Sequence, residues 1–92
     1  MKLKKEIKKY LNNKDDFKIE LFWRIDEGYT WLEKTSSINL ENYENIIDEY
    51  IHETEYESQN IKKEYFKNSY LEDFYLDFNL FKNQTLIERE ES

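Results

Sequence analysis

Residues 17–25, FKIELFWRI, alternate apolar and polar side chains and therefore decide the fold class. Side chains two residues apart share one face of a β-strand. The apolar face of this strand would consist of Phe17, Ile19, Leu21, Trp23 and Ile25. Gly28 follows where a tight hairpin needs a residue that tolerates positive φ, so residues 29–34 are predicted to return as the paired strand.

A second hairpin is predicted near the C-terminus. Residues 74–80 alternate apolar with polar side chains, and Lys82 to Gln84 can turn this strand into a partner at residues 85–90. Between the hairpins, the polar residues 35–39 predict a connector in which Asn39 or Ser37 caps the following helix.

Helical spacing occurs in two segments. Apolar side chains at Leu3, Ile7, Tyr10 and Leu11 stand among lysines, which predicts an amphipathic helix over the first dozen residues. A longer stripe predicts a helix from Leu40 to about Thr54, and its members are Leu40, Tyr43, Ile47, Tyr50 and Ile51. Residues 53–58 also fit a short strand, but we favour helix, continued to Asn68.

Strands grouped in hairpins predict an antiparallel sheet. We therefore expect an α+β fold, in which a small antiparallel sheet of two hairpins has its helices packed on one face. A chain of 92 residues suits one hydrophobic core, so residues 1–92 are expected to form a single domain.

The residue types that common catalytic sites need are scarce. One glycine cannot build a phosphate-cradling loop, and the lack of cysteine excludes thiolate chemistry and the common structural zinc sites. His52 is the single histidine and is predicted to be solvated on the polar side of its helix. Pairs of carboxylates arise by chance among 21 acidic residues. We therefore expect that the protein is not an enzyme and that it has no catalytic residues, no metal site and no cofactor.

The expected location follows from what the apolar residues can and cannot do. No apolar run is long enough to span a bilayer, and the lysine-rich start is not followed by the apolar stretch of a signal peptide. We expect no membrane partner and a cytoplasmic protein, in the cytoplasm of the host cell if a phage encodes it.

Charge is unevenly distributed along the chain. Residues 1–14 carry six lysines against Glu6, although the whole chain has a net charge of −7. Residues 36–60 contain seven carboxylates and no Lys or Arg. At 100° per residue, several of these carboxylates fall within an arc of about 60°, and they are Glu41, Glu44, Asp48 and Glu55. Nothing nearby in sequence compensates them, and such a surface would repel nucleic acid.

Two interpretations of this acidic face stand side by side. It is a solvated surface, since a net charge of about 2 to 8 is ordinary in a small domain, or it docks on a basic protein with tyrosines as further contacts. Tyr50, Tyr56 and Tyr75 are the tyrosines predicted to be exposed. The candidate partner-binding residues are Glu41, Glu44, Asp48, Glu49, Glu55, Glu57, Tyr50, Tyr56, Glu72, Asp73 and Asp77.

In composition and layout, carried by residues 41–57, Glu72, Asp73 and Asp77, the chain resembles small phage and viral inhibitors that imitate nucleic acid, including some anti-CRISPR proteins. The resemblance involves no shared motif. It implies an inhibitor whose phosphate-like carboxylates block a basic nucleic-acid-binding protein such as a CRISPR effector. The alternatives are an immunity protein that neutralises a cognate nuclease toxin, and a structural or assembly subunit, which leaves a homodimer open.

Overall fold

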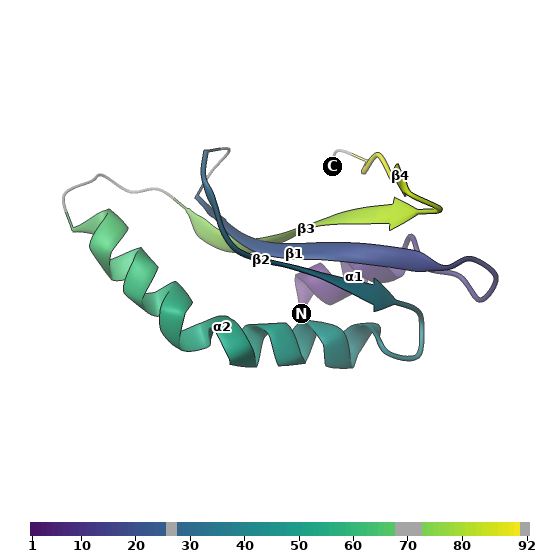
Figure 1. The fold of residues 1–92 in the computed structure, drawn as a ribbon, viewed down its shortest axis with the longest axis horizontal. Coiled ribbons are helices and arrows are strands. Elements are labelled where there is room, and N and C mark those ends of the chain that lie inside the picture. The colour runs from purple at the N-terminus through teal and green to yellow at the C-terminus, as the bar shows by residue number, and fades with distance from the viewer. Residues whose placement is uncertain (26–27, 68–72, 91–92) are drawn as a thin grey trace.

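The computed structural model describes residues 1–25, 28–67 and 73–90, which form two helices and four strands. The strands make one antiparallel sheet in the order β2-β1-β3-β4. Both helices lie on one face of this sheet (Figure 1), so the predicted α+β class is confirmed. In chain order the elements are α1 (Lys2–Lys8), β1 (Phe17–Ile25), β2 (Thr30–Ile38), α2 (Tyr43–Phe66), β3 (Phe74–Lys82) and β4 (Thr85–Leu86).

The core lies between the sheet and the helices. Phe17, Ile19 and Leu21 of β1 are each at most 3% exposed, on the face that their alternation predicts. In β3, Phe78 and Leu80 are fully buried opposite Leu21 and Ile19. The helical side of the core contains Ile7, Leu11, Tyr43, Ile47 and Tyr50. Burying an aliphatic or aromatic side chain contributes about 1.5 to 3 kcal/mol, so this cluster holds the helices to the sheet.

Strand β2 is longer than the sequence predicted. Residues 35–37 pair with β1 in regular register, so the predicted polar connector at residues 35–39 is wrong. Their polarity was misleading because an outer strand can carry small polar side chains that face water. The register shifts between Leu21 and Trp23, where Leu32 has a φ of 60°. Such an extra residue in one strand is a β-bulge, which bends the strand.

Helix α2 begins at Tyr43, three residues after the predicted start. The Asn39 side chain accepts hydrogen bonds from the N–H groups of Glu41 and Asn42 at 2.9 and 2.8 Å. The N-cap residue of α2 is Asn42, and no side chain caps the helix. Asn39 closes only the turn that precedes the helix, so the prediction that Asn39 or Ser37 caps it is wrong.

The same helix continues without interruption through residues 53–58, which confirms helix over strand for that segment. Thr54 donates its hydroxyl hydrogen to the Tyr50 carbonyl at 2.7 Å, and Ser58 donates to the Glu55 carbonyl at 2.9 Å. Hydroxyls bonded back to the preceding turn bend helices. In Figure 1, α2 bends near its middle and its second half turns toward the end of the sheet. The indole of Trp23 donates to Thr54 at 2.9 Å, which ties the bend to β1.

The terminal elements differ from prediction in length. Helix α1 ends at Lys8 and not near Leu11, although Leu11 is still buried in the core. Strand β4 has two residues where residues 85–90 were predicted to pair, but the N–H of Ile87 still donates to the Leu80 carbonyl at 2.8 Å. The chain after β4 therefore stays beside β3.

Candidate partner-binding surface

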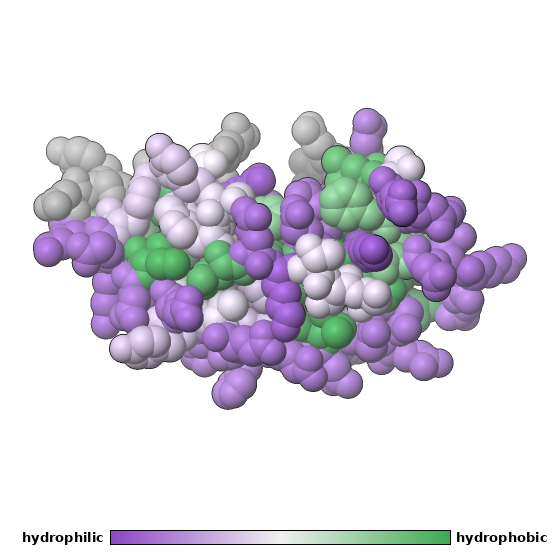
Figure 2. All heavy atoms as spheres, viewed as in Figure 1, coloured by the Kyte–Doolittle hydropathy of each residue, from purple (hydrophilic) through white to green (hydrophobic). Residues whose placement is uncertain are grey.

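The outer surface of α2 carries the carboxylates that the sequence singled out. All seven acidic residues between positions 36 and 60 are exposed. Hydrophilic side chains cover the α2 side of the molecule in Figure 2. Helical phase divides these carboxylates into two rows. The α1-side row comprises Glu44, Asp48 and Glu55 of α2 together with Glu41 of the turn before the helix, and the β2-side row comprises Glu49, Glu53 and Glu57.

One carboxylate of each row is neutralised by a lysine from another element. Lys4 of α1 lies 2.7 Å from Asp48, and Lys34 of β2 lies 2.8 Å from Glu53. The hydrogen bond to Asp48 raises the pKa of Lys4 above its ordinary value. The expectation of an uncompensated face is therefore wrong at these two positions, because the compensating charges come from distant parts of the chain.

The remaining carboxylates of the two rows form no ion pair. Every Lys and Arg of the chain belongs to the described residues. None of them pairs with these side chains, which are Glu41, Glu44, Glu49, Glu55 and Glu57. The surface thus keeps exposed negative charge that no Lys or Arg of the chain neutralises.

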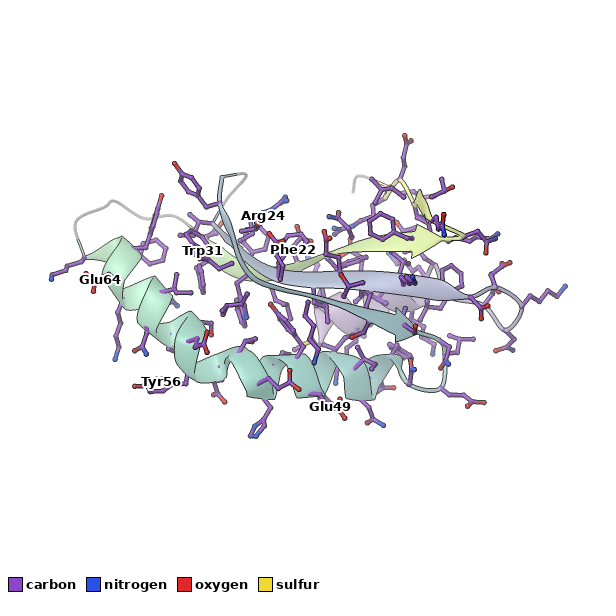
Figure 3. The ribbon with its side chains drawn as sticks, in the orientation of Figure 1. Phe22, Arg24, Trp31, Glu49, Tyr56 and Glu64 are labelled. Atoms are coloured by element: carbon purple, nitrogen blue, oxygen red, sulfur yellow. The ribbon has the colours of Figure 1, made fainter. Side chains whose placement is uncertain are left out.

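Tyr56 lies among these carboxylates and is 79% exposed. Figure 3 shows Tyr56 and Glu49 projecting from α2 away from the sheet. An aromatic ring so exposed, flanked in sequence by Glu55 and Glu57, offers apolar contact area next to charge. The prediction that Tyr56 is exposed is confirmed.

Tyr50 does not belong to this surface. It is 1% exposed, and its hydroxyl donates to the carbonyl of Leu32 at 2.5 Å. Burial, together with the charge of Glu33, raises the pKa of Tyr50 far above its ordinary value. Its helical phase with Tyr43 and Ile47 had already placed it in the apolar stripe, and that assignment holds.

The predicted contacts on β3 lie apart from α2. Asp77 points to the sheet face opposite the helices, where its side chain is 13% exposed and lies 2.8 Å from Arg89 and 3.5 Å from Arg24. It is a paired and nearly buried carboxylate, so it does not extend the exposed surface of α2, and its contact with a partner stays a prediction. Asp73 and Tyr75 are exposed, whereas Glu72 lies outside the described residues.

Arg89 makes several polar contacts that the sequence analysis did not predict. Its guanidinium donates to Asp77, to the Phe78 carbonyl and to Glu6 at 2.8, 3.0 and 2.7 Å. It also lies 4.0 Å from the centre of the Phe78 ring. Burial lowers the pKa of Arg89, but the bonds to Glu6 and Asp77 outweigh this and raise it. No local pattern marks this residue, because Glu6 lies at the other end of the chain.

The described residues contain little that suits catalysis. His52 is exposed, and no hydrogen bond or ion pair to another described residue orients it. Within the described ranges, no three His, Asp or Glu side chains converge as metal ligands. A hollow of about 370 Å³ lies between the start of β1, the end of β2 and the β3–β4 turn. No helix in the described part of the chain could cross a membrane.

Comparison with protein-family models, with curated proteins and with solved structures gives no match for this chain. The candidate surface therefore rests on its own geometry and charge.

Proposed function

We propose that the protein is a binding inhibitor whose α2 surface occupies the basic nucleic-acid-binding site of a defence protein such as a CRISPR effector, and that it has no catalytic activity. The observation that supports this most is the set of exposed carboxylates along α2 without ion pairs, two of which, Glu55 and Glu57, flank the exposed Tyr56. Nucleic acid would be displaced from the target by direct competition.

The spacing of the carboxylates suits this role. A helix of 24 residues is about 36 Å long. Neighbours three or four residues apart have Cβ atoms about 5 to 6 Å apart, which is comparable with the separation of successive phosphates along a strand. Basic side chains that bind a row of phosphates can therefore bind a row of these carboxylates.

The unpaired carboxylates are the ones that add affinity. Asp48 and Glu53 would have to exchange an internal lysine for a basic group of the partner. Glu49, Glu55 and Glu57 exchange only water for such a group. Exposed charge of one sign also accelerates encounter with an oppositely charged surface, and salt suppresses this effect.

The test uses an affinity-tagged protein in its natural host, with capture of bound proteins at low salt. The neutralised variant combines Glu49→Gln, Glu55→Gln and Glu57→Gln. The matched control variant removes the same number of charges from exposed residues outside α2, by Asp16→Asn, Glu88→Gln and Glu90→Gln. We expect the unmodified protein and the control variant to capture a nucleic-acid-binding protein and the neutralised variant to lose it.

The captured protein also decides between this proposal and its alternatives. A single nuclease toxin would identify an immunity protein, and capture of the chain by itself would identify an assembly subunit. Equal loss in the neutralised and control variants would mean that net charge alone matters, which would contradict a role for the α2 surface.

A further inference from the structure

Strand β2 is an outer strand of the sheet, and its pairing with β1 determines which of its peptide groups point away from the sheet. The N–H of Ile25 donates to the carbonyl of Tyr29 at 3.2 Å, so the peptide groups of Ile25 point toward the β2 side. Alternate residues of an antiparallel strand point to the same side. The odd-numbered residues of β1, including Phe17 and Ile19, therefore also point toward β2.

The β2 residues that pair with these odd-numbered residues direct their own peptide groups toward β1. Ile38 and Ser36 pair with Phe17 and Ile19, so by the same alternation Thr35 and Ser37 direct their N–H and C=O groups away from the sheet. Both residues are exposed, and no hydrogen bond from another described element reaches their backbone groups.

This part of the β2 edge also lacks the usual protection. Natural outer strands are blunted by charged side chains, proline, bulges or covering segments. The bulge at Leu32 protects only the first half of β2, where Tyr50 binds the Leu32 carbonyl. Residues 35–37 are Thr, Ser and Ser. On the opposite side of the sheet, β4 and the bond from Ile87 to Leu80 occupy the edge of β3.

The open edge lies beside the β2-side row of carboxylates. The ion pair from Lys34 to Glu53 joins β2 to that row, and the first half of α2 runs alongside β2 in Figure 1. Glu49 stands one helical turn before Glu53 in this half of α2, about 6 Å away along the axis. Side chains on one face of an added strand repeat about every 6.6 Å. This spacing matches that of carboxylates one helical turn apart.

From this match we propose that the β2 edge binds an extended basic segment of the partner as an additional strand of the sheet. Backbone groups of Thr35 and Ser37 pair with the segment, and its alternate Lys or Arg side chains reach the β2-side row. The inference rests on the proposed function, since it specifies how the basic partner docks. A second copy of this chain fits less well, because its own β2-side row would meet the first one.

The probe for this docking mode is a fluorescein-labelled ten-residue peptide that alternates lysine and valine, compared with the same peptide N-methylated at every second residue. Methylation removes donors from the peptide and leaves the protein unchanged. Ser37→Pro removes one outward N–H from the protein, and Ser37→Ala is its control because it keeps that N–H. Fluorescence anisotropy at low salt measures each affinity, and circular dichroism confirms that each variant is folded.

We expect Ser37→Pro and the methylated peptide each to weaken binding about tenfold, since hydrogen bonds in a strand pair are lost, and Ser37→Ala to bind like the unmodified protein. The neutralised variant should also bind weakly. If it binds weakly while proline and methylation change nothing, strand addition is overturned and the charged α2 surface stands. If neutralisation changes nothing, the proposed function fails. A free protein that is a dimer, and becomes a monomer with Ser37→Pro, would overturn the assignment of the edge to a basic partner.

Discussion

Replacing Arg89 by alanine should lower the stability of the fold by about 2 to 3 kcal/mol. The change removes hydrogen bonds to two carboxylates and a carbonyl, and the stacking on Phe78 at 4.0 Å. A hydrogen bond to a charged group contributes about 1.5 to 3 kcal/mol. Because the Arg89 side chain is 30% exposed and Glu6 is 32% exposed, the bond to Glu6 adds little. The bond to Asp77 dominates, since that carboxylate is 13% exposed and would keep only Arg24 as an ion-pair partner among the described residues.

Thermal unfolding followed by the fluorescence of Trp23 and Trp31 measures this effect. A loss of 2 to 3 kcal/mol corresponds to a decrease in Tm of about 10 to 20 °C for a domain of this size. The Tm of Arg89→Lys should lie between those of Arg89→Ala and the unmodified protein, because an ammonium group cannot bind both carboxylates at once. Glu88→Ala, on the same segment and exposed, is the control and should change stability by less than about 0.5 kcal/mol. If Arg89→Ala were as stable as this control, the C-terminal segment would not be anchored by its guanidinium.

Three further predictions concern stability. Gln84→Gly should stabilise the protein by about 1 kcal/mol in thermal unfolding, because Gln84 has a φ of 68° and a non-glycine residue is strained there; equal or lower stability would show that its side chain matters more than this strain. Tyr50→Phe should cost about 1 kcal/mol in urea unfolding, since the Leu32 carbonyl loses its donor, and an unchanged midpoint would contradict that bond. Because burial raises the pKa of Tyr50 in the folded state, the stability that its protonated hydroxyl contributes is complete below pH 10 and is lost as the pH rises further. The free energy of unfolding should therefore decrease less above pH 10 in Tyr50→Phe than in the unmodified protein. The neutralised variant should be more stable than the unmodified protein by a few tenths of a kcal/mol in low-salt thermal unfolding, because like charges at helical spacing repel; a loss of stability would show that these carboxylates have structural partners.

The sheet was predictable where one face of a strand is buried. Phe17, Ile19 and Leu21 recur every second residue because only that face meets the helices. The second half of β2 carries no such pattern. Thr35 and Ser37 are strand residues because β1 lies beside them, and this pairing between distant residues is not visible in a local window.

The candidate site was predictable in its phase and not in its charge balance. Helical spacing correctly placed Glu44, Asp48 and Glu55 together on the outside of α2. It could not show that Asp48 meets Lys4, because α1 and α2 are brought together only by the core between them. The ion pair of Asp77 could not be predicted either, since its partner Arg89 lies on a separate segment after β4.

Displacement of nucleic acid from the captured target tests the central claim most directly. Target bound to labelled DNA or RNA is titrated with the unmodified protein, the neutralised variant and the control variant at low and at high salt. The α2 surface predicts that the unmodified protein and the control variant release the nucleic acid completely, with a midpoint that rises steeply with salt, and that the neutralised variant releases little. A stable complex that contains protein, target and nucleic acid together would contradict it.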